Sequence, residues 1–388
     1  MNIILFDNQY KIKMLPLTFI RSMADIRVGI LTVKEKWEHF FAKKISVLSE
    51  EYLQNLYPLH LDSDNVFIAA HLLPSPSLFH AIQKLNLNEA LTDNEGIILA
   101  KRAHSLDDFY NQNHNPIVFE GDFSHLNSKN DIFTLNPAQI CSDFHLLTHQ
   151  RVTAPLDPSN KLIGDPANLF IEEGAQIYHA TINCSTGPVY IGAHTEIMEG
   201  SAIRGPFALL EHGVVKMGTK IYEGTTIGPY CKVGGELSNV VMFGYSNKAH
   251  DGYLGNAVVG TWCNIGAGTS ASNLKNDYSI VKQWDYSVDK YPKTGLQFCG
   301  LIMGDHSKCG INVSFNTGTV MGICSNVYGS NFQNFHIPSF RIGSPNQGYI
   351  KNNFEKIMAS ENAMMRRRNI EMDETYLEIL RNLYTKTD

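Results

Sequence analysis

The stretch that decides the fold runs from Val189 to Val233 and reads VYIGAHTEIMEGSAIRGPFALLEHGVVKMGTKIYEGTTIGPYCKV. Aliphatic residues recur in it at every sixth position, eight times in succession: Ile191, Ile197, Ile203, Leu209, Val215, Ile221, Ile227 and Val233. A helix with 3.6 residues per turn would rotate such a series off its buried face, and a single strand does not run so long. A six-residue repeat with Gly after several aliphatic positions is typical of a parallel β-helix.

The same repeat extends on both sides of this stretch. It begins near Ile163, shifts phase at Gly187-Pro188 and ends after Val327; further members are Ile171, Ile177, Val259, Ile265, Ala271, Met303, Cys309, Phe315 and Met321. Between Asp277 and Phe298 the period is lost in a stretch that contains Trp, Tyr and Lys, which we expect to be a loop. The repeat therefore predicts a β-helix domain over residues 156–345.

Residues 1–155 have a different pattern, in which short apolar runs alternate with segments of helical spacing. The expected strands are Asn2–Phe6, Val66–Ala70, Gly96–Ala100 and Pro116–Glu120, and the expected helices are Val33–Phe41, Pro76–Leu85 and Ile132–Leu147. Ser75 or Ser77 would cap the second helix, and Asp131 would cap the third. Alternating strands and helices predict an α/β layer fold.

The ends of the repeat set the expected domain boundaries. A connection with Pro155 and Pro158 separates an N-terminal domain, residues 1–155, from the β-helix. After the repeat, Asn353–Leu383 has helical spacing, so residues 346–388 form a C-terminal helical tail. We interpret the run from Arg366 to Arg368 as a solvated face of that tail.

Composition excludes several classes of protein. The chain has 388 residues, a formal charge of −6, 43% hydrophobic and 18% charged residues, which describes a globular protein without the basic footprint of a nucleic-acid binder. No apolar run is long enough to cross a membrane, and no secretory signal is present. The seven cysteines form no CxxC pair, so we expect a reduced, cytoplasmic protein without a zinc site. No metal ligands can be assigned.

The repeat is interrupted at Ser238–Tyr253, and such breaks in a regular architecture are common functional sites. The break contains NKAHDGYLG from Asn247 to Gly255, followed by NIGAGT from Asn264 and by Asn273. This run resembles the acetyltransferase half of the bifunctional enzymes that make UDP-N-acetylglucosamine, and with GINVS at Gly310–Ser314 it looks closest to the archaeal members. The resemblance covers about residues 160–330. It implies a left-handed coil and a homotrimer with active sites between coils.

The resemblance also implies roles for individual residues. His250 takes the position of the general base, and an imidazole with a pKa near ~6.5 suits that task. Asn264 and Asn273 would hold the amine and the thioester carbonyl. Tyr253 and a lysine would contact the sugar phosphate; the candidate lysines are Lys216, Lys220, Lys232 and Lys275. Gly310, Asn312 and Ser314 would contact the pantetheine arm of acetyl-CoA. The alternative is that His250 only packs at a trimer interface.

The N-terminal domain resembles the sugar-nucleotidyltransferase half of the same family, in its divergent Bacteroidetes-type subfamily. Leu15-Pro-Leu-Thr18 followed by Arg21-Ser22 is similar to a segment of that half. The family's Gly-rich phosphate loop is absent, because Asn8-Gln-Tyr-Lys11 follows the first strand without a glycine. If UTP and Mg²⁺ bind here, Arg21 and Lys13 are the candidates to replace the missing backbone amides.

The sequence thus predicts an enzyme that acetylates an amino-sugar phosphate, glucosamine-1-phosphate, with acetyl-CoA. A second step would use UTP to form UDP-N-acetylglucosamine for the cell envelope. Two alternatives remain open. One is an acyltransferase for a different amino sugar or a sugar nucleotide. The other is a non-catalytic assembly protein that senses sugar nucleotides.

Overall fold

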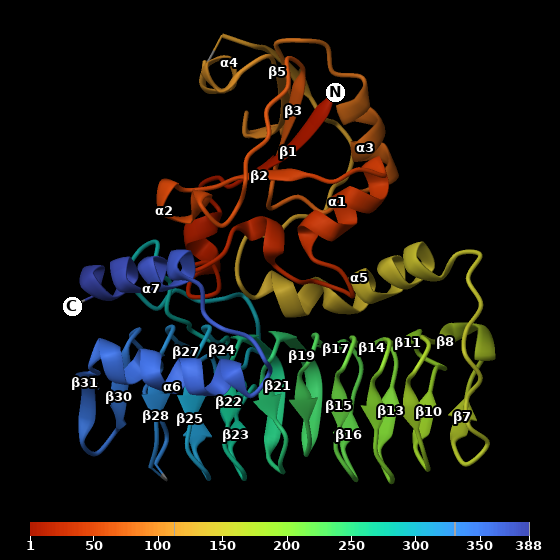
Figure 1. The fold of residues 1–388 in the computed structure, drawn as a ribbon, viewed down its shortest axis with the longest axis vertical. Coiled ribbons are helices and arrows are strands. Elements are labelled where there is room, and N and C mark those ends of the chain that lie inside the picture. The colour runs from red at the N-terminus through yellow and green to blue at the C-terminus, as the bar shows by residue number, and fades with distance from the viewer. Residues whose placement is uncertain (112, 330, 388) are drawn as a thin grey trace. The chain divides into compact units, whose positions relative to one another are not determined.

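The computed structural model describes residues 1–111, 113–329 and 331–387 (Figure 1). The chain forms two compact units, which are described separately. The first consists of Met1–Met14, Ile20–Ile26 and Leu31–Ser128; the second consists of Leu15–Phe19, Arg27–Ile30 and Lys129–Asp388. The domain boundaries at residues 155 and 345 stay predictions.

The first unit is built on a mixed sheet in the order β2-β1-β3-β5-β4-β6. Its strands are β1 (Asn2–Phe6), β2 (Ser46–Leu48), β3 (Asn65–Ala69), β4 (Glu89–Thr92), β5 (Ile98–Ala103) and β6 (Asn115–Val118). Its helices are α1 (Val33–Phe41), α2 (Glu51–Gln54), α3 (Pro76–Gln83) and α4 (Leu106–Tyr110), with 3-10 turns η1 (Lys11–Met14) and η2 (Met23–Asp25). β1 pairs in parallel with β2 and β3, as its almost wholly apolar sequence favours.

The strands and helices expected in residues 1–155 are confirmed, with ends shifted by up to three residues, whereas β2, β4, α2 and α4 were not expected. Ser75 accepts a hydrogen bond from the amide of Leu78 and is the cap of α3. The prediction that Asp131 caps a helix is wrong. Asp131 is the first residue of α5 (Asp131–Thr148), and Asn130 precedes it as the N-cap, without a capping side-chain bond. An acidic side chain in a first turn still favours the helix dipole.

The second unit is a parallel β-solenoid with three faces (Figure 1). Face 1 contains β8 (Leu169–Ile171), β11 (Val189–Ile191), β14 (Phe207–Leu209), β17 (Thr225–Ile227), β24 (Ile302–Met303), β27 (Val320–Met321) and β29 (His336–Ile337). Face 2 contains β9 (Gln176–Ile177), β12 (Glu196–Ile197), β15 (Val214–Val215), β18 (Lys232–Val233), β20 (Asn247–Lys248), β22 (Asn264–Ile265), β25 (Lys308–Cys309), β28 (Asn326–Val327), β30 (Arg341–Ser344) and β31 (Gly348–Lys351). Face 3 contains β7 (Lys161–Ile163), β10 (Thr181–Asn183), β13 (Ala202–Arg204), β16 (Lys220–Ile221), β23 (Ser270–Ala271) and β26 (Ser314–Phe315).

The hexad residues fill the interior of this coil. The eight aliphatic residues of the opening stretch are 0–3% exposed. On face 2, Ile197 pairs with Val215, which pairs with Val233, so the interior positions stack directly from coil to coil. Burying one such side chain contributes roughly 1.5–3 kcal/mol, so the column drives the fold.

The interruption of the repeat is a shortened coil. Val215 pairs with Val233, 18 residues further on, but Val233 pairs with Lys248, only 15 residues further on. Two long strands, β19 (Glu236–Gly244) and β21 (Tyr253–Thr261), continue from face 3 to face 1 and pair with strands of both. The interior side chains of this coil are therefore offset from the regular six-residue spacing.

Helices accompany the solenoid within the second unit. α5 packs on face 1 through Ile140 and Phe144, which contact Phe170 and Tyr190. After the last coil, α6 (Phe354–Arg366) follows Asn353 as N-cap, and α7 (Glu374–Lys386) ends the described chain. The short turn η3 (Pro166–Asn168) precedes β8. The expected loop at 277–298 has only isolated bridges and no strand.

The predicted fold class, an α/β domain followed by a parallel β-helix and terminal helices, is confirmed. No helix in the described part of the chain is both long enough and apolar enough to cross a membrane.

Candidate functional site

A cavity of about 480 Å³ lies in the second unit, where face 2 meets the end of α6. Three of the predicted site residues, His250, Asn264 and Lys232, line it together. Its other lining residues are Tyr245, Asn247, Ala249, Trp262, Ile265, Gly266, Ala267, Ile311, Met364, Arg367 and Arg368. Because no carboxylate is among these lining residues, and Lys232, Arg367 and Arg368 carry basic side chains, the cavity suits an anion.

His250 lies at the corner that follows β20, with its side chain exposed. Within the described residues the imidazole has no hydrogen-bond partner. The backbone around it is held firmly, since the amide of Gly268 donates to the carbonyl of Asp251 (3.0 Å). The ring is therefore open to a ligand on a fixed corner.

Lys232 opens β18 on the outer side of face 2. Burial lowers the pKa of Lys232, and the positive charges of Arg368, Lys216 and Arg367 lower it further, against the raising effect of Glu196. An anion bound among these side chains would relieve the repulsion that lowers the pKa of Lys232.

The interpretation of Arg366–Arg368 as a solvated face is wrong for Arg368. Its guanidinium is half-buried and donates to the carbonyl of Tyr230 (3.3 Å) and to Asn247 Oδ1 (3.5 Å). Arg367 also lines the cavity, whereas Arg366 is 70% exposed in its side chain and pairs with Glu371 at 3.9 Å. The end of α6 therefore turns two of the three arginines toward the solenoid.

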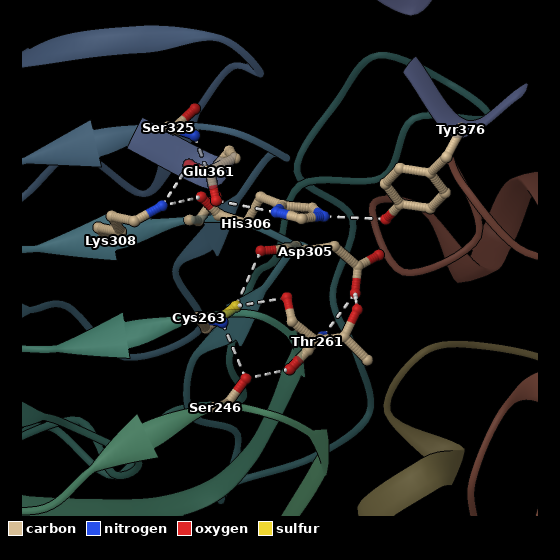
Figure 2. A network of polar contacts seen from close by, with 12 residues as sticks. Ser246, Thr261, Cys263, Asp305, His306, Lys308, Ser325, Glu361 and Tyr376 are labelled. Carbon is tan, nitrogen blue, oxygen red and sulfur yellow. Dashed lines mark hydrogen bonds and ion pairs between the residues drawn. The ribbon is translucent and has the colours of Figure 1, made fainter. Parts of the chain in front are cut away.

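A buried polar network fixes α6 on the coil (Figure 2). Glu361 of α6 receives a hydrogen bond from His306 Nδ1 (2.9 Å) and an ion pair from Lys308, and His306 Nε2 lies 2.9 Å from the hydroxyl of Tyr376 in α7. Burial alone would raise the pKa of Glu361, but the bond and charge of His306 and the charge of Lys308 lower it. This network determines where the arginines at the end of α6 lie.

The remaining sugar-site residues are not at this cavity. Tyr253 opens β21 around the corner, where Asn273 Nδ2 donates to its hydroxyl (3.0 Å) and to Asn256 Oδ1 (2.8 Å). Burial raises the pKa of Tyr253, while its bond from Asn273 lowers it. Lys275 donates to Ser279 Oγ (3.2 Å). Tyr253 and Asn273 thus form a pair of their own, separate from His250.

The turn at Gly310–Ser314 belongs to the coil after the cavity. Its residue Ile311 lines the cavity and is 68% exposed, and the amide of Asn312 donates to the carbonyl of Ala267 (2.7 Å). Ser314 lies in β26 on face 3. Gly266 permits this stacking, because a Cβ there would lie 2.2 Å from the carbonyl oxygen of Gly310.

The carboxyl end of β1 in the first unit has a buried carboxyl group, in contrast to the basic cavity of the second unit. Asp7 follows β1 and accepts hydrogen bonds from Ser22 Oγ (2.8 Å), the amide of Met23 (2.9 Å) and Ser49 Oγ (2.5 Å). Burial raises the pKa of Asp7, against the lowering effect of Lys11. The carboxyl group thus already uses the local hydroxyl and amide donors, and the ammonium of Lys11 lies 3.7 Å from it.

The two residues proposed to replace the amide cradle lie near this end. Arg21 is 8% exposed, and the ammonium of Lys13 lies 5.3 Å from the ring centre of Tyr10. Tyr10 stacks on His71 (4.5 Å), which bonds to Asn8 (3.0 Å). Burial and the charge of His125 lower the pKa of His71 to about 3, so its ring is neutral. Among the described residues no group of three metal-ligating side chains was found.

Sequence reasoning missed Arg367, Arg368 and Lys248. Nothing in the run of arginines indicates a cavity, because α6 reaches the coil only through tertiary contacts. Lys248 could have been found: Met242, Lys248 and Leu254 are six residues apart, so the hexad series continues through the break with a lysine at an interior position.

Comparison with known proteins finds similarity over parts of the chain. Residues 3–152 match the family described as sugar nucleotidyl transferase, and a parallel β-solenoid follows them. Parts of the chain are also similar to bifunctional GlmU proteins. The GlmU of Nostoc sp. is 32% identical over 155 residues, covering 34% of this chain and 33% of that protein. The GlmU of Methanocaldococcus jannaschii is 30% identical over 118 residues, covering 30% and 26%.

These matches span a third or less of the length of the relatives. Among solved structures, the polySia specific acetyltransferase NeuO matches 50% of this chain and 83% of its own, with 13% identity and a TM-score of 0.25. A likeness at that level says nothing about activity.

Proposed function

We propose that the second unit transfers an acetyl group from acetyl-CoA to the amine of a phosphorylated amino sugar, of which glucosamine-1-phosphate is the simplest. One observation supports this most: His250 and Asn264 line one cavity with Lys232, Arg367 and Arg368, and no carboxylate lines it. A base, an amide and an anion-binding group are what this reaction needs.

The chemistry assigns one task to each group. The imidazole of His250 takes a proton from the ammonium or from the attacking amine, and the amine nitrogen forms a bond to the thioester carbonyl carbon. The carbon–sulfur bond then breaks, and the imidazolium returns the proton to the departing thiolate. The side-chain amide of Asn264 donates to oxygen that becomes negative in the transition state. The cations bind the phosphate of the acceptor.

The alternative acceptor, a nucleotide-linked amino sugar, has the same phosphate chemistry. The second step, uridylyl transfer in the first unit, has weaker support. Family membership of residues 3–152 favours it, but the buried carboxyl group of Asp7 at the end of β1 disfavours phosphate there. We therefore propose acetyl transfer as the main activity.

We further propose a homotrimer assembled along the coil. α6 covers part of face 2, whereas face 3 exposes Ile163 (38%) and Tyr222 (43%) beside a groove of about 360 Å³. Apolar side chains of this kind on a flat flank favour association with a second copy. Sedimentation equilibrium that gives a monomer at micromolar concentration would contradict the trimer.

The test is thiol release from acetyl-CoA in the presence of glucosamine-1-phosphate. His250→Ala should lower turnover by roughly 10²–10⁴-fold with unchanged melting, the usual range for loss of one general base. His194→Ala is the control: His194 is also an exposed corner histidine, but it stacks on His212 and does not line the cavity. Equal turnover in the His250 variant and the control would remove the proposal.

A further inference from the structure

Lys248 carries a charged side chain at an interior position of the solenoid, where the neighbouring coils have aliphatic residues. It lies on the interior side of β20, paired with Val233 in the column that also contains Ile197, Val215 and Ile265, and it is 1% exposed. Burying an ammonium among aliphatic side chains is unfavourable unless it is hydrogen-bonded. Burial indeed lowers the pKa of Lys248 to about 8, although Asp251 and Cys309 raise it.

The ammonium is used to hold the corner that follows. Lys248 Nζ donates to the carbonyl of His250 (2.6 Å) and to the carbonyl of Gly234 in the preceding coil (3.1 Å). The amide of Gly234 in turn donates to the carbonyl of Lys248 (2.7 Å). The backbone of His250 is thereby bound through one side chain to the neighbouring coil.

This bond matters because the imidazole has no other orienting group. A general base is normally oriented by a second residue that bonds to its ring. His250 makes no such side-chain bond within the described residues, so the direction of its ring depends on the backbone of the corner. Lys248 itself does not line the cavity and cannot contact a ligand there.

We propose that Lys248 is a positioning residue that fixes the corner of His250 for acetyl transfer, at the expense of packing in the coil. The inference rests on the proposed function of His250. Replacement of Lys248 by an apolar residue should therefore maintain or raise the melting temperature while it lowers kcat. Replacement of a merely structural lysine would lower both.

The test compares Lys248→Met, Lys248→Gln and His250→Gln in the full chain. Met fits the aliphatic column, so the melting temperature of Lys248→Met should equal or exceed that of the parent, while kcat falls roughly 10- to 100-fold, as for a displaced catalytic group. KM for both substrates should stay nearly unchanged. Gln retains donors for the two carbonyls and should recover part of kcat.

Val215→Met is the packing control, because Val215 lies in the same column two coils away from His250. Its kcat should stay that of the parent. If His250→Gln abolishes turnover while Lys248→Met keeps full kcat, the positioning role is wrong and the proposed function stands. If His250→Gln keeps full turnover, both are wrong. If the Met and Gln variants both fail to fold, Lys248 is structural and the inference is likewise wrong.

Discussion

The carboxyl end of β1 lies in the first unit and the corner after β20 lies in the second, and the side chains at the two places permit different chemistry. At the corner, cations and an imidazole without a ring partner face an open cavity. At the end of β1, the carboxyl group of Asp7 is buried and uses the nearby hydroxyl and amide donors. Because a fold does not by itself imply a function, the function of each unit has to be argued from its own site.

The largest effect should come from the network that fixes α6. Glu361→Gln leaves Lys308 without its buried partner and should lower the free energy of unfolding by about 3–5 kcal/mol. Glu355→Gln is the control on the same helix, because Glu355 forms only an exposed pair with Arg381 (3.5 Å) and should cost less than about 1 kcal/mol. If chemical denaturation shows that Glu361→Gln and Glu355→Gln lower the free energy of unfolding equally, the network does not anchor α6.

Arginine substitutions sharpen the claim that the cavity binds an anion. Arg368→Ala should raise KM for glucosamine-1-phosphate roughly 10- to 100-fold with little change in kcat, since one charge-assisted bond contributes about 1.5–3 kcal/mol. Arg366→Ala should leave KM unchanged, because its side chain is mostly exposed and away from the cavity. A KM for acetyl-CoA that rises instead would assign the arginines to the phosphates of coenzyme A.

In the first unit the expected effect is on stability alone. Asp7→Asn replaces one of two accepting oxygens with an NH2 donor, so either Ser49 or the pair Ser22 and Met23 loses its acceptor, which should cost about 1–3 kcal/mol on unfolding. Acetyl transfer by the folded variant should be unchanged. If titration calorimetry instead finds tight UTP binding by the parent that Asp7→Asn removes, the end of β1 is a working nucleotide site.

The smallest effect is a pH dependence of stability from Lys248. Its folded-state pKa is about 8, below the usual 10.5, so between these values the unfolded chain binds more protons than the folded chain. The parent should therefore gain stability relative to Lys248→Met as pH rises from 7 to 10, by about 1–2 kcal/mol after screening. Denaturation at both pH values, with Val215→Met as control, measures the difference. If the difference in unfolding free energy between the parent and Lys248→Met is the same at both pH values, the pKa of Lys248 is not lowered by folding.

The solenoid could be predicted from sequence because a six-residue period has one structural explanation. The corner of His250 could be predicted because its residues are contiguous and the repeat fails around them. Arg368 could not, since it lies more than a hundred residues from His250 and reaches the cavity only because Glu361 is bound by Lys308. Tyr253 does not line the cavity of His250, because three residues along this coil are enough to pass from one face to the next, so its role as a sugar-phosphate contact stays a prediction.

The central proposal is that the corner of His250 catalyses acetyl transfer, and that this, rather than uridylyl transfer at the end of β1, is the main activity. One preparation of the full chain tests both when thiol release from acetyl-CoA with glucosamine-1-phosphate and pyrophosphate release from UTP, Mg²⁺ and N-acetylglucosamine-1-phosphate are measured side by side. The account predicts thiol release that His250→Ala abolishes, and pyrophosphate release at background level. Pyrophosphate release without thiol release would contradict it.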